Sequence, residues 1–343
     1  MKTTLFLDIG SGTQDVLYYT EGHELENCCK FVLPAPAKVI AKRVEELTAS
    51  GSNIYFYGTN MGGGFFGAVK KHLKAGLHAA IHPEAAYALY DDPKRVTELG
   101  LSITEECPEE YSPVELCDFN AGWWGSFLSL AGLSYPDQVI AAAQDHGVHI
   151  DEGNRVGRFK MWRELLLAND GDPYSLIYQT PTGALTRLAT IQKATGGGAV
   201  ADSAAAAVLG ALYVPEVAQR SWRTGITVVN VGNSHTSAFL VYQERIISVY
   251  EHHTGMLTQE TLLHDLKEFR RGWLTDEMVR DAGGHGCMFL DIPDEAEGFM
   301  PTYVLGPKRN MLEGQGMMIA PGGDMMLAGC FGLLKAFQKM QEK

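Results

Sequence analysis

The chain has 343 residues, of which 45% are hydrophobic, 20% charged and 10% aromatic. This composition excludes a mainly disordered chain, and the length favours two domains over a single large one. The formal net charge of −13 excludes a generally basic surface for nucleic acid or anionic lipid, although a phosphate ligand can still bind through Mg²⁺ and backbone amides.

The first apolar run ends at Asp8 after only three residues, and the most apolar later stretch, residues 199–214, is shorter than a spanning helix and contains Asp202. We therefore expect neither a signal peptide nor a membrane segment. The six cysteines include no CxxC pair and do not form a disulfide framework. The expected location is thus the reducing cytoplasm.

The first predicted element is a buried strand over TTLFLDI, residues 3–9. It leads into a glycine turn, Gly10-Ser11-Gly12-Thr13, and a second strand at 16–19. Because no GK[ST] follows and no helix opens at the turn, this is not a P-loop.

A second copy of this pattern, ITVVNVGNSHTSAFLVY, begins at Ile226, with Asn230 in the place of Asp8 and Gly232 in the place of Gly10. Two similar hairpins this far apart predict a duplicated domain rather than a short repeat array.

The stretch between the two hairpins has an α/β pattern. We predict a strand at 54–57, a helix at 66–74, a strand or helix at 138–144, a helix at 159–169 and a surface loop or insertion boundary at 105–113. An alanine-dense helix in ATGGGAVADSAAAAVLGAL precedes the second hairpin. The chain closes with a strand TYVLG, a turn PKRN, a strand MMIA and a helix from about Asp324.

Five segments, in this order, resemble the motifs of the actin-like ATPase superfamily, which includes sugar kinases, DnaK-type chaperones and actin. LFLDIGSGTQDVLYY resembles its first phosphate motif, GGGAVADSAAAAVLGAL its first connecting helix, VVNVGNSHTSAFLVY its second phosphate motif, VLGPKRNML its adenosine motif and GGDMMLAGCFGLLKAF its second connecting helix. Residues 60–195 hardly take part in the resemblance.

The resemblance implies an α/β fold of two ribonuclease-H-like lobes, a duplicated actin-like ATPase fold with a nucleotide cleft between the lobes. The expected lobes are 1–198, with an insertion around 85–135, and 199–343, with connecting helices at about 202–212 and 324–338. Within the superfamily the chain resembles a family labelled pyruvate formate-lyase activating-enzyme-like. The sequence contradicts that label, because radical enzymes of that type need a CxxxCxxC motif and this chain has none.

ATP and Mg²⁺ are the cofactors that the resemblance implies. The expected nucleotide contacts are Gly10, Ser11, Gly12, Thr13, Gln14, Gly232, Asn233, Ser234, His235, Thr236, Gly306, Pro307, Asn310, Gly322 and Gly323. Glycines let backbone N–H groups approach phosphate oxygens, and a carboxylate is needed to hold hydrated Mg²⁺. Asp8 is the expected metal-side carboxylate; the alternative is a turn aspartate with only a capping hydrogen bond.

Asp202 and Asp145 are the candidate catalytic residues. Sugar kinases place a general base at the start of the first connecting helix, where Asp202 stands, and the helix macrodipole there favours an ionised carboxylate. The alternative for Asp202 is a simple helix cap. Asp145 is expected, with His146, in an acceptor pocket.

Further polar residues carry weaker signals. Asp118, Asn120 and Trp123-Trp124 are candidates for the acceptor pocket, and His252 or His253 for a ligand contact, although aromatic pairs are more often core residues and loop histidines more often solvated. His78 and His82 have i, i+4 spacing, but Pro83 and the absence of a third nearby ligand argue against a metal site.

The leading function is a small-molecule kinase with a nucleotide and a metabolite as partners, no nucleic acid and no membrane; a homodimer is left open. One alternative is an ATP-driven activator of a redox enzyme, with Cys107 and Cys117 holding an iron–sulfur cluster across a dimer. Another is a nucleotide-dependent scaffold. The small residues of the two connecting helices also predict that the regions of Gly210 and Gly329 touch at the base of the cleft.

Overall fold

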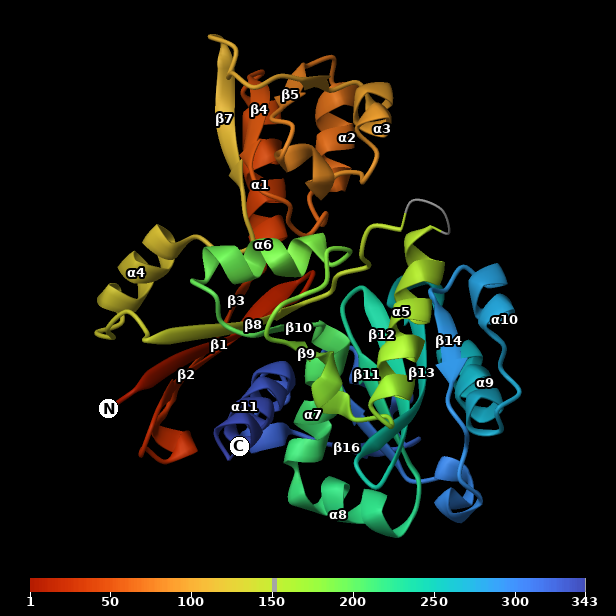
Figure 1. Ribbon diagram of the computed structural model, residues 1–343. Coiled ribbons are helices and arrows are strands. Elements are labelled where there is room, and N and C mark those ends of the chain that lie inside the picture. Colours follow the sequence, from red (N-terminus) through yellow and green to blue (C-terminus); the bar gives the residue numbers. More distant parts are fainter. Residues whose placement is uncertain (150–152, 343) are drawn as a thin grey trace.

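Two six-stranded sheets form the body of the computed structural model, which describes residues 1–149 and 153–342 (Figure 1). In spatial order the first sheet contains β3 (Cys29–Pro34), β2 (Thr13–Thr20), β1 (Thr3–Ile9), β8 (Gln138–Ala143), β10 (Val200–Ala201) and β9 (Ile177–Tyr178). The second contains β14 (Gly286–Phe289), β13 (Arg245–His253), β12 (His235–Tyr242), β11 (Ile226–Val231), β15 (Thr302–Leu305) and β16 (Met317–Met318).

The two sheets repeat one topology. In each, the first strand pairs antiparallel with its hairpin partner on one side and parallel with a later strand on the other: β1 lies between β2 and β8, and β11 lies between β12 and β15. A third antiparallel strand, β3 or β13, extends each hairpin. This is the ribonuclease-H-like arrangement, so the prediction of a duplicated α/β fold is confirmed.

The opening strand reads as a continuous apolar run because both faces of its sheet are covered. Leu5, Phe6 and Leu7 are all fully buried. Leu5 and Leu7 pack in one core with Trp124 and Leu128 of the helix α4 (Ala121–Leu130), whereas Phe6 packs with Phe331 in another. The alternation of these residues between two cores is what places Asp8, the next residue, at the end of a fully enclosed strand.

A smaller four-stranded parallel sheet stands apart from the two lobes, with its own core, at the top of Figure 1. Its strands, in spatial order, are β6 (Ser102–Ile103), β5 (Ala79–Ile81), β4 (Asn53–Gly58) and β7 (Tyr111–Leu116), and its helices are α1 (Pro36–Ala49), α2 (Phe66–Lys74) and α3 (Pro93–Leu99). The strand predicted at 54–57 and the helix at 66–74 are confirmed. The insertion was predicted around residues 85–135. The unit built on the four-stranded sheet begins well upstream of that range, because α1 and β4 already belong to it.

The other helices cover the two large sheets. They are α4 (Ala121–Leu130), α5 (Asn154–Ala168), α6 (Thr186–Ala194), α7 (Ser203–Tyr213), α8 (Pro215–Arg223), α9 (Gln259–Arg270), α10 (Asp276–Asp281) and α11 (Ala328–Gln341). Short 3₁₀ segments lie at Leu25–Asn27, Ala85–Ala88, Pro173–Leu176, Thr254–Met256, Asp294–Phe299, Arg309–Leu312 and Pro321–Gly323. The segment 138–144, predicted as a strand or a helix, contains the strand β8. The helix predicted at 159–169 is α5, which begins earlier, at residue 154.

Packing does not follow the predicted boundary at residues 198/199. Phe159 and Trp162 of α5 pack in one core with Val228 and Phe239 of the second sheet. Conversely, α11, at the C-terminal end, packs through Phe337 against the first sheet. Each lobe therefore borrows a helix from the other half of the sequence, which ties the two lobes together at the base.

The two connecting helices α7 and α11 lie side by side (Figure 1). Glycines let their backbones approach closely. A Cβ at Gly210 would overlap the carbonyl of Ala328, and one at Gly332 would overlap the carbonyl of Ala206. The predicted contact at Gly210 is thus present, but its partner glycine is Gly332. Gly329 itself faces Asp8. The helix α11 begins at Ala328, four residues later than predicted.

We expect Gly332→Leu to lower the free energy of unfolding by about 1–3 kcal/mol, because the new side chain overpacks the α7–α11 crossing. Denaturant unfolding measures this effect. Gly67→Leu is the matched control, because Gly67 also lies in a helix, α2, but is exposed and has open space around it. A Gly332→Leu protein of unchanged stability would contradict the crossing geometry.

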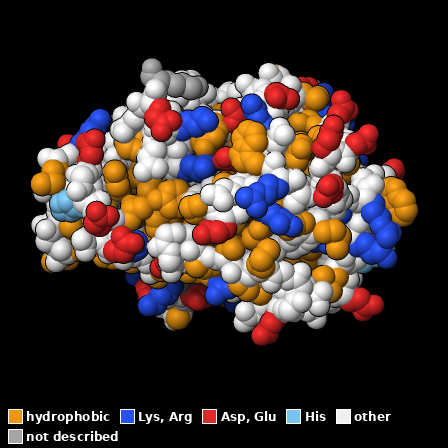
Figure 2. Space-filling model, turned by 90° about the horizontal axis from the view of Figure 1, so that it is seen from below, with side chains coloured by type: hydrophobic (Ala, Val, Ile, Leu, Met, Phe, Trp, Pro, Cys, Tyr) orange, Lys and Arg blue, Asp and Glu red, His pale blue; other side chains and the backbone are white. Residues whose placement is uncertain are grey.

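None of the helices in the described part of the chain has the length and apolar character that crossing a membrane requires. On the face shown in Figure 2, acidic and basic side chains are interspersed with apolar ones. No continuous basic stripe crosses the described residues of this face.

Candidate functional site

A cleft of about 470 Å³ lies between the two lobes and reaches up to the smaller sheet. Its lining brings together most of the predicted nucleotide residues: Gly10, Ser11, Thr13, Gly232, Asn233, Ser234, His235, Gly306 and Pro307. Asp8, Asp145 and Asp202 line it as well. The predicted site residues from distant parts of the chain therefore converge on one cavity.

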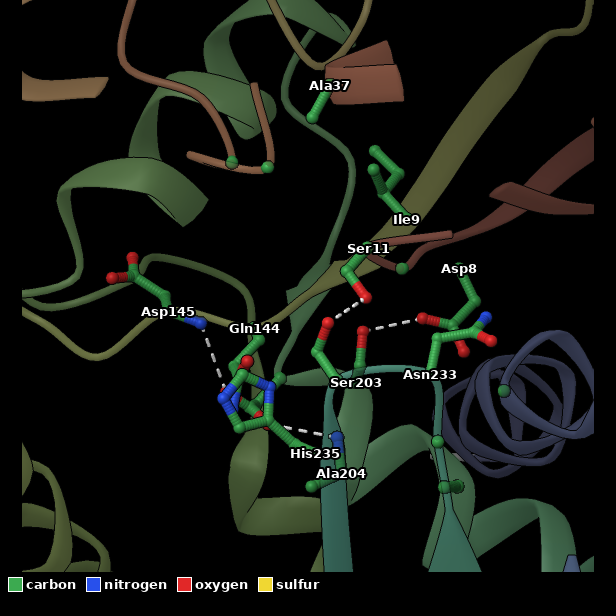
Figure 3. Close-up of a pocket in the computed structure, with 18 of the residues that line it drawn as sticks. Asp8, Ile9, Ser11, Ala37, Gln144, Asp145, Ser203, Ala204, Asn233 and His235 are labelled. Atoms are coloured by element: carbon green, nitrogen blue, oxygen red, sulfur yellow. Dashed lines mark hydrogen bonds between the residues drawn. The ribbon is translucent and has the colours of Figure 1, made fainter. Parts of the chain in front are cut away.

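The two glycine turns meet across this cleft. Ser11 Oγ and Ser234 Oγ are 2.7 Å apart (Figure 3). A Cβ on Gly12 would lie 2.5 Å from the side-chain nitrogen Nδ2 of Asn233. Each turn is closed by the same backbone hydrogen bond, from Gly10 N to Thr13 O and from Gly232 N to the carbonyl three residues on, both 2.9 Å long. The equivalent turns of the two lobes are thus in contact, through the side chains of Ser11, Asn233 and Ser234.

The second turn is held from behind by Thr254, which follows β13. Thr254 Oγ1 donates to the Gly232 carbonyl at 2.9 Å, and its backbone N–H donates to the Ser234 carbonyl at 2.8 Å. Thr236 Oγ1 lies 3.0 Å from Thr254 Oγ1, so the side chain of Thr236 supports the turn from within rather than facing the cleft.

Asp8 and Asp15 form a pair of carboxylates at the floor of the cleft. They are direct cross-strand partners in the first hairpin. Burial raises the pKa of Asp8 to about 6, and burial together with the Asp8 charge raises the pKa of Asp15 to about 8. Ser203 Oγ donates to Asp8 Oδ1 at 2.6 Å (Figure 3). Among the described residues, Asp15 Oδ1 has no hydrogen-bond partner.

The first turn of α11 is shaped around this carboxylate pair. A Cβ at Gly329 would overlap the carboxylate of Asp8, so only glycine leaves room for it there. The thiol of Cys330 donates to the backbone carbonyl of Asp15 at 3.1 Å. The second connecting helix thus positions the two acidic residues directly.

Asp202 lies in a buried ion network rather than free in the cleft. Arg158 Nη1 donates to Asp202 Oδ2 at 2.5 Å, and Arg158 Nη2 donates to Glu251 Oε2 at 2.8 Å. The backbone N–H groups of Ala204 and Asp145 also donate to Asp202, so it caps α7 as the alternative interpretation expected. Burial alone would raise the pKa of Glu251, but Arg158 holds it well below its ordinary value.

Asp145 lies next to this network, at the end of β8. Its oxygens accept from the backbone N–H groups of Gly147 at 2.9 Å and Leu188 at 3.0 Å. Burial nevertheless raises the pKa of Asp145 above its ordinary value. Both candidate catalytic carboxylates therefore border the cleft, and both have oxygens already engaged; their catalytic roles stay predictions.

A fixed polar wall faces the turns from the first lobe. Arg187, at the start of α6, donates from Nε and Nη2 to the two oxygens of Asp118 at 2.7 and 2.9 Å. Its Nη1 donates to the carbonyl of Gln144 at 2.7 Å. The loop at residues 60–64 completes this wall, with the Gly62 backbone close to the guanidinium. The side chains of Asp118 and Arg187 are thus locked by one another.

Several predicted site residues lie outside the lining of the cleft as the structure describes it. Gln14 is buried in β2, Asn310 is exposed in a 3₁₀ segment, and Gly322 packs on the ring of Phe331 with Gly323 beside it in the same segment. Of the weaker candidates, Asn120 caps α4, Trp124 is core and Trp123 is half exposed. Only Asp118 of that group reaches the cleft.

The sequence analysis missed several groups in and behind the lining of the cleft. Asp15, Arg187 and Glu251 line it. Arg158 and His285 contact lining residues instead: Arg158 bonds to Asp202 and Glu251, and His285 lies beside His146 and His235. Burial lowers the pKa of His235 to about 4. The local signal for Asp15 was its register opposite Asp8. For a lone arginine in a helix or a single histidine before a strand, the sequence carries no comparable signal.

The family model described as "Putative pyruvate format-lyase activating enzyme (DUF1786)" matches residues 61–311. No curated protein sequence matches the chain.

Solved structures with similar chain traces include the activator of the 2-hydroxyisocaproyl-CoA dehydratase from Clostridium difficile with bound ADPNP, at 9% identity and a TM-score of 0.33, covering 99% of this chain and 98% of that chain. MreB 5 of Spiroplasma citri bound to AMPPNP is similar at 10% identity and a TM-score of 0.35, covering 100% and 98%. The ethanolamine utilization protein EutJ from Carboxydothermus hydrogenoformans is similar at 11% identity and a TM-score of 0.30, covering 97% and 89%. Sequence identities and TM-scores this low do not indicate a shared function.

Proposed function

The chain belongs to the family described as "Putative pyruvate format-lyase activating enzyme (DUF1786)", and we propose that it binds Mg-ATP in the interlobe cleft and transfers the terminal phosphoryl group to a small-molecule acceptor. The observation that carries this proposal is the meeting of the two glycine turns, joined by the 2.7 Å contact of Ser11 and Ser234, over the carboxylates of Asp8 and Asp15. The radical chemistry in the family's description is not supported, because the sequence lacks the CxxxCxxC motif.

Backbone N–H groups of the two turns are the groups that would hold the phosphates. A concave run of such groups binds anions without basic side chains, which suits a chain of net charge −13. A phosphate chain lying between the turns would replace the hydrogen bond of Ser11 and Ser234. Binding of nucleotide is therefore expected to alter the spacing of the two lobes.

The residues at the floor fit a hydrated Mg²⁺. Asp8 and Asp15 are hard oxygen donors, and the buried Asp15 Oδ1 is without a hydrogen-bond partner in the described structure. Burial raises the pKa of both carboxyls, and a bound cation would offset the cost of ionising them side by side. When bound, Mg²⁺ neutralises charge on the phosphates. Ser203 holds Asp8 in place from the first turn of α7.

The acceptor would lie against the wall of Asp118, Arg187 and the loop at residues 60–64. Since Asp118 already neutralises Arg187, this wall favours a hydroxyl-bearing acceptor over a multiply charged one. Asp145 and Asp202 line the same cleft and are the candidates for accepting the hydroxyl proton. Asp145 fits the role better, because Asp202 is neutralised by Arg158.

Nucleotide binding is tested by thermal unfolding. At a ligand concentration a hundredfold above the dissociation constant, ATP with Mg²⁺ should add about 2.7 kcal/mol to the free energy of unfolding. The same measurement without Mg²⁺ should give a smaller shift. If no purine nucleotide shifts the transition, with or without Mg²⁺, the proposal fails. Transfer is then tested by following ADP release over a panel of hydroxylated metabolites.

The redox-activator alternative depends on Cys107 and Cys117. Cys107 Sγ lies 3.7 Å from the carbonyl of Tyr111, the first residue of β7, whereas Cys117 follows the last residue of that strand. A strand of six residues is about 20 Å long, so the two thiols of one chain cannot share one cluster. Iron and sulfide analysis of anaerobically purified protein separates the two functions: a cluster would favour the activator.

A further inference from the structure

Three histidines and a glutamate converge at one side of the cleft. One ligand atom from each of His146, His235, Glu251 and His285 can be chosen so that all four atoms lie within 4.8 Å of one another. Glu251 and His285 are buried, whereas His146 and His235 are partly buried and line the cleft with Glu251. It is the single such group among the residues the structure describes.

The distances within the group suit one central ion. His285 Nδ1 lies 3.1 Å from His146 Nε2 and 3.0 Å from Glu251 Oε1. Four ligands at about 2.1 Å from a tetrahedral ion are about 3.4 Å from one another. The side chains would therefore need only small adjustments around a metal.

The hydrogen bonds around the group leave electron pairs pointing inward. Arg155 Nη2 donates to His253 Nε2 at 3.2 Å, so that nitrogen is an acceptor. His285 Nε2, also 3.2 Å from it, is then the donor, and a neutral His285 carries its lone pair on Nδ1, toward Glu251 and His146. One proton on Nδ1 would serve only one of these two neighbours well, whereas a metal ion accepts electron pairs from all four groups.

Neighbouring residues hold two of the four side chains, His285 and Glu251, by hydrogen bonds of the kind that orient metal ligands. His253 accepts from the far nitrogen of His285, Gln144 Nε2 donates to Glu251 Oε1 at 2.8 Å, and Arg158 donates to Glu251 Oε2 at 2.8 Å. Arg158 balances only one of the two carboxylates, Asp202 and Glu251, with which it pairs. The buried group thus retains negative charge that a cation would offset.

We infer that His146, His235, Glu251 and His285 bind a divalent transition-metal ion, of the class represented by Zn²⁺, Fe²⁺ and Co²⁺, at a site distinct from that proposed for Mg²⁺. Imidazole nitrogens select these ions, whereas Mg²⁺ prefers oxygen ligands. His146 follows β8 of the first lobe, and the other three ligands lie on or beside β12, β13 and β14 of the second. The ion therefore links the two lobes at the wall of the cleft.

The test is metal binding to the full chain after dialysis against a chelator. Titration with Co²⁺ should give one equivalent bound with visible d–d absorption, and Zn²⁺ should displace it. A tenfold excess of Mg²⁺ should not. If wild-type protein binds neither Co²⁺ nor Zn²⁺ at this stoichiometry, the inference is wrong.

Variants locate the site. His235→Ala and His285→Ala should each weaken Zn²⁺ binding more than about 100-fold, beyond the 10–100-fold typical of an outer-shell residue, which is the range expected for His253→Ala. His264→Ala, on the exposed side of α9, is the matched control and should bind as wild type. Far-UV circular dichroism of the metal-free variants shows whether they are folded. Folded His235→Ala and His285→Ala proteins that keep wild-type Zn²⁺ affinity would overturn the inference.

Discussion

Replacing Arg158 with methionine is expected to lower the free energy of unfolding by about 3–5 kcal/mol, the cost of removing one partner from a buried ion pair. The guanidinium is fully buried and bonded to both Asp202 and Glu251. Methionine fills similar volume but leaves two buried carboxylates without a counter-charge. Denaturant unfolding of the metal-free protein measures the effect, so that metal binding does not contribute.

The matched control is Arg43→Met, the same substitution in an exposed ion pair. Arg43 lies 3.5 Å from Glu46, and both side chains are about half exposed, at 54% and 52%. Surface pairs of this kind contribute about 0–1 kcal/mol. Equal effects of the two substitutions would show that the network around Arg158 does not stabilise the protein as the structure indicates.

Asp8→Asn is expected to reduce Mg²⁺-dependent turnover of ATP by about 10²–10³-fold, comparable to the loss of one preorganised electrostatic contact. The free energy of unfolding should stay the same or rise. Burial raises the pKa of Asp8 to about 6, so at neutral pH the folded state holds an ionised group less favourably than the unfolded state does, and the neutral amide removes that cost.

This combination separates a metal ligand from a structural residue. If Asp8 served only the turn, Asp8→Asn would lower stability and leave turnover largely intact. Asp137→Asn is the control, because that carboxylate is exposed at the far end of β1, where it accepts from the Thr3 backbone N–H and hydroxyl. It should leave the Mg²⁺ dependence of turnover unchanged.

The two hairpins could be predicted from the sequence because their signals are local. A continuous apolar run, a polar residue at its end and a glycine turn occupy consecutive positions, and strand burial and turn chemistry act over that same range. The repetition of the pattern from Ile226 was enough to predict duplicated lobes and the positions of Asp8, Gly10 and Gly232. The small residues of α7 and α11 likewise predicted a close crossing.

The identity of the contacts within that crossing was decided by tertiary structure. Gly210 meets Ala328 and Gly332 meets Ala206, while Gly329 makes room for Asp8. A stripe of small residues permits many relative rotations of two helices, and only the register of α11 against β1 selects one. The same holds for α5, whose apolar face packs on the sheet of the other lobe.

Tertiary structure alone also decided the surroundings of Asp202 and the histidine group. Sequence analysis left Asp202 between a general base and a helix cap, because nothing nearby in the chain reveals that Arg158 reaches it from α5. His146 and His285 are 139 positions apart and belong to different lobes, yet their ring nitrogens lie 3.1 Å from each other. Local patterns report the neighbours of a residue along the chain, whereas the charge and ligands around a buried group come from whichever strands the folded sheets bring together.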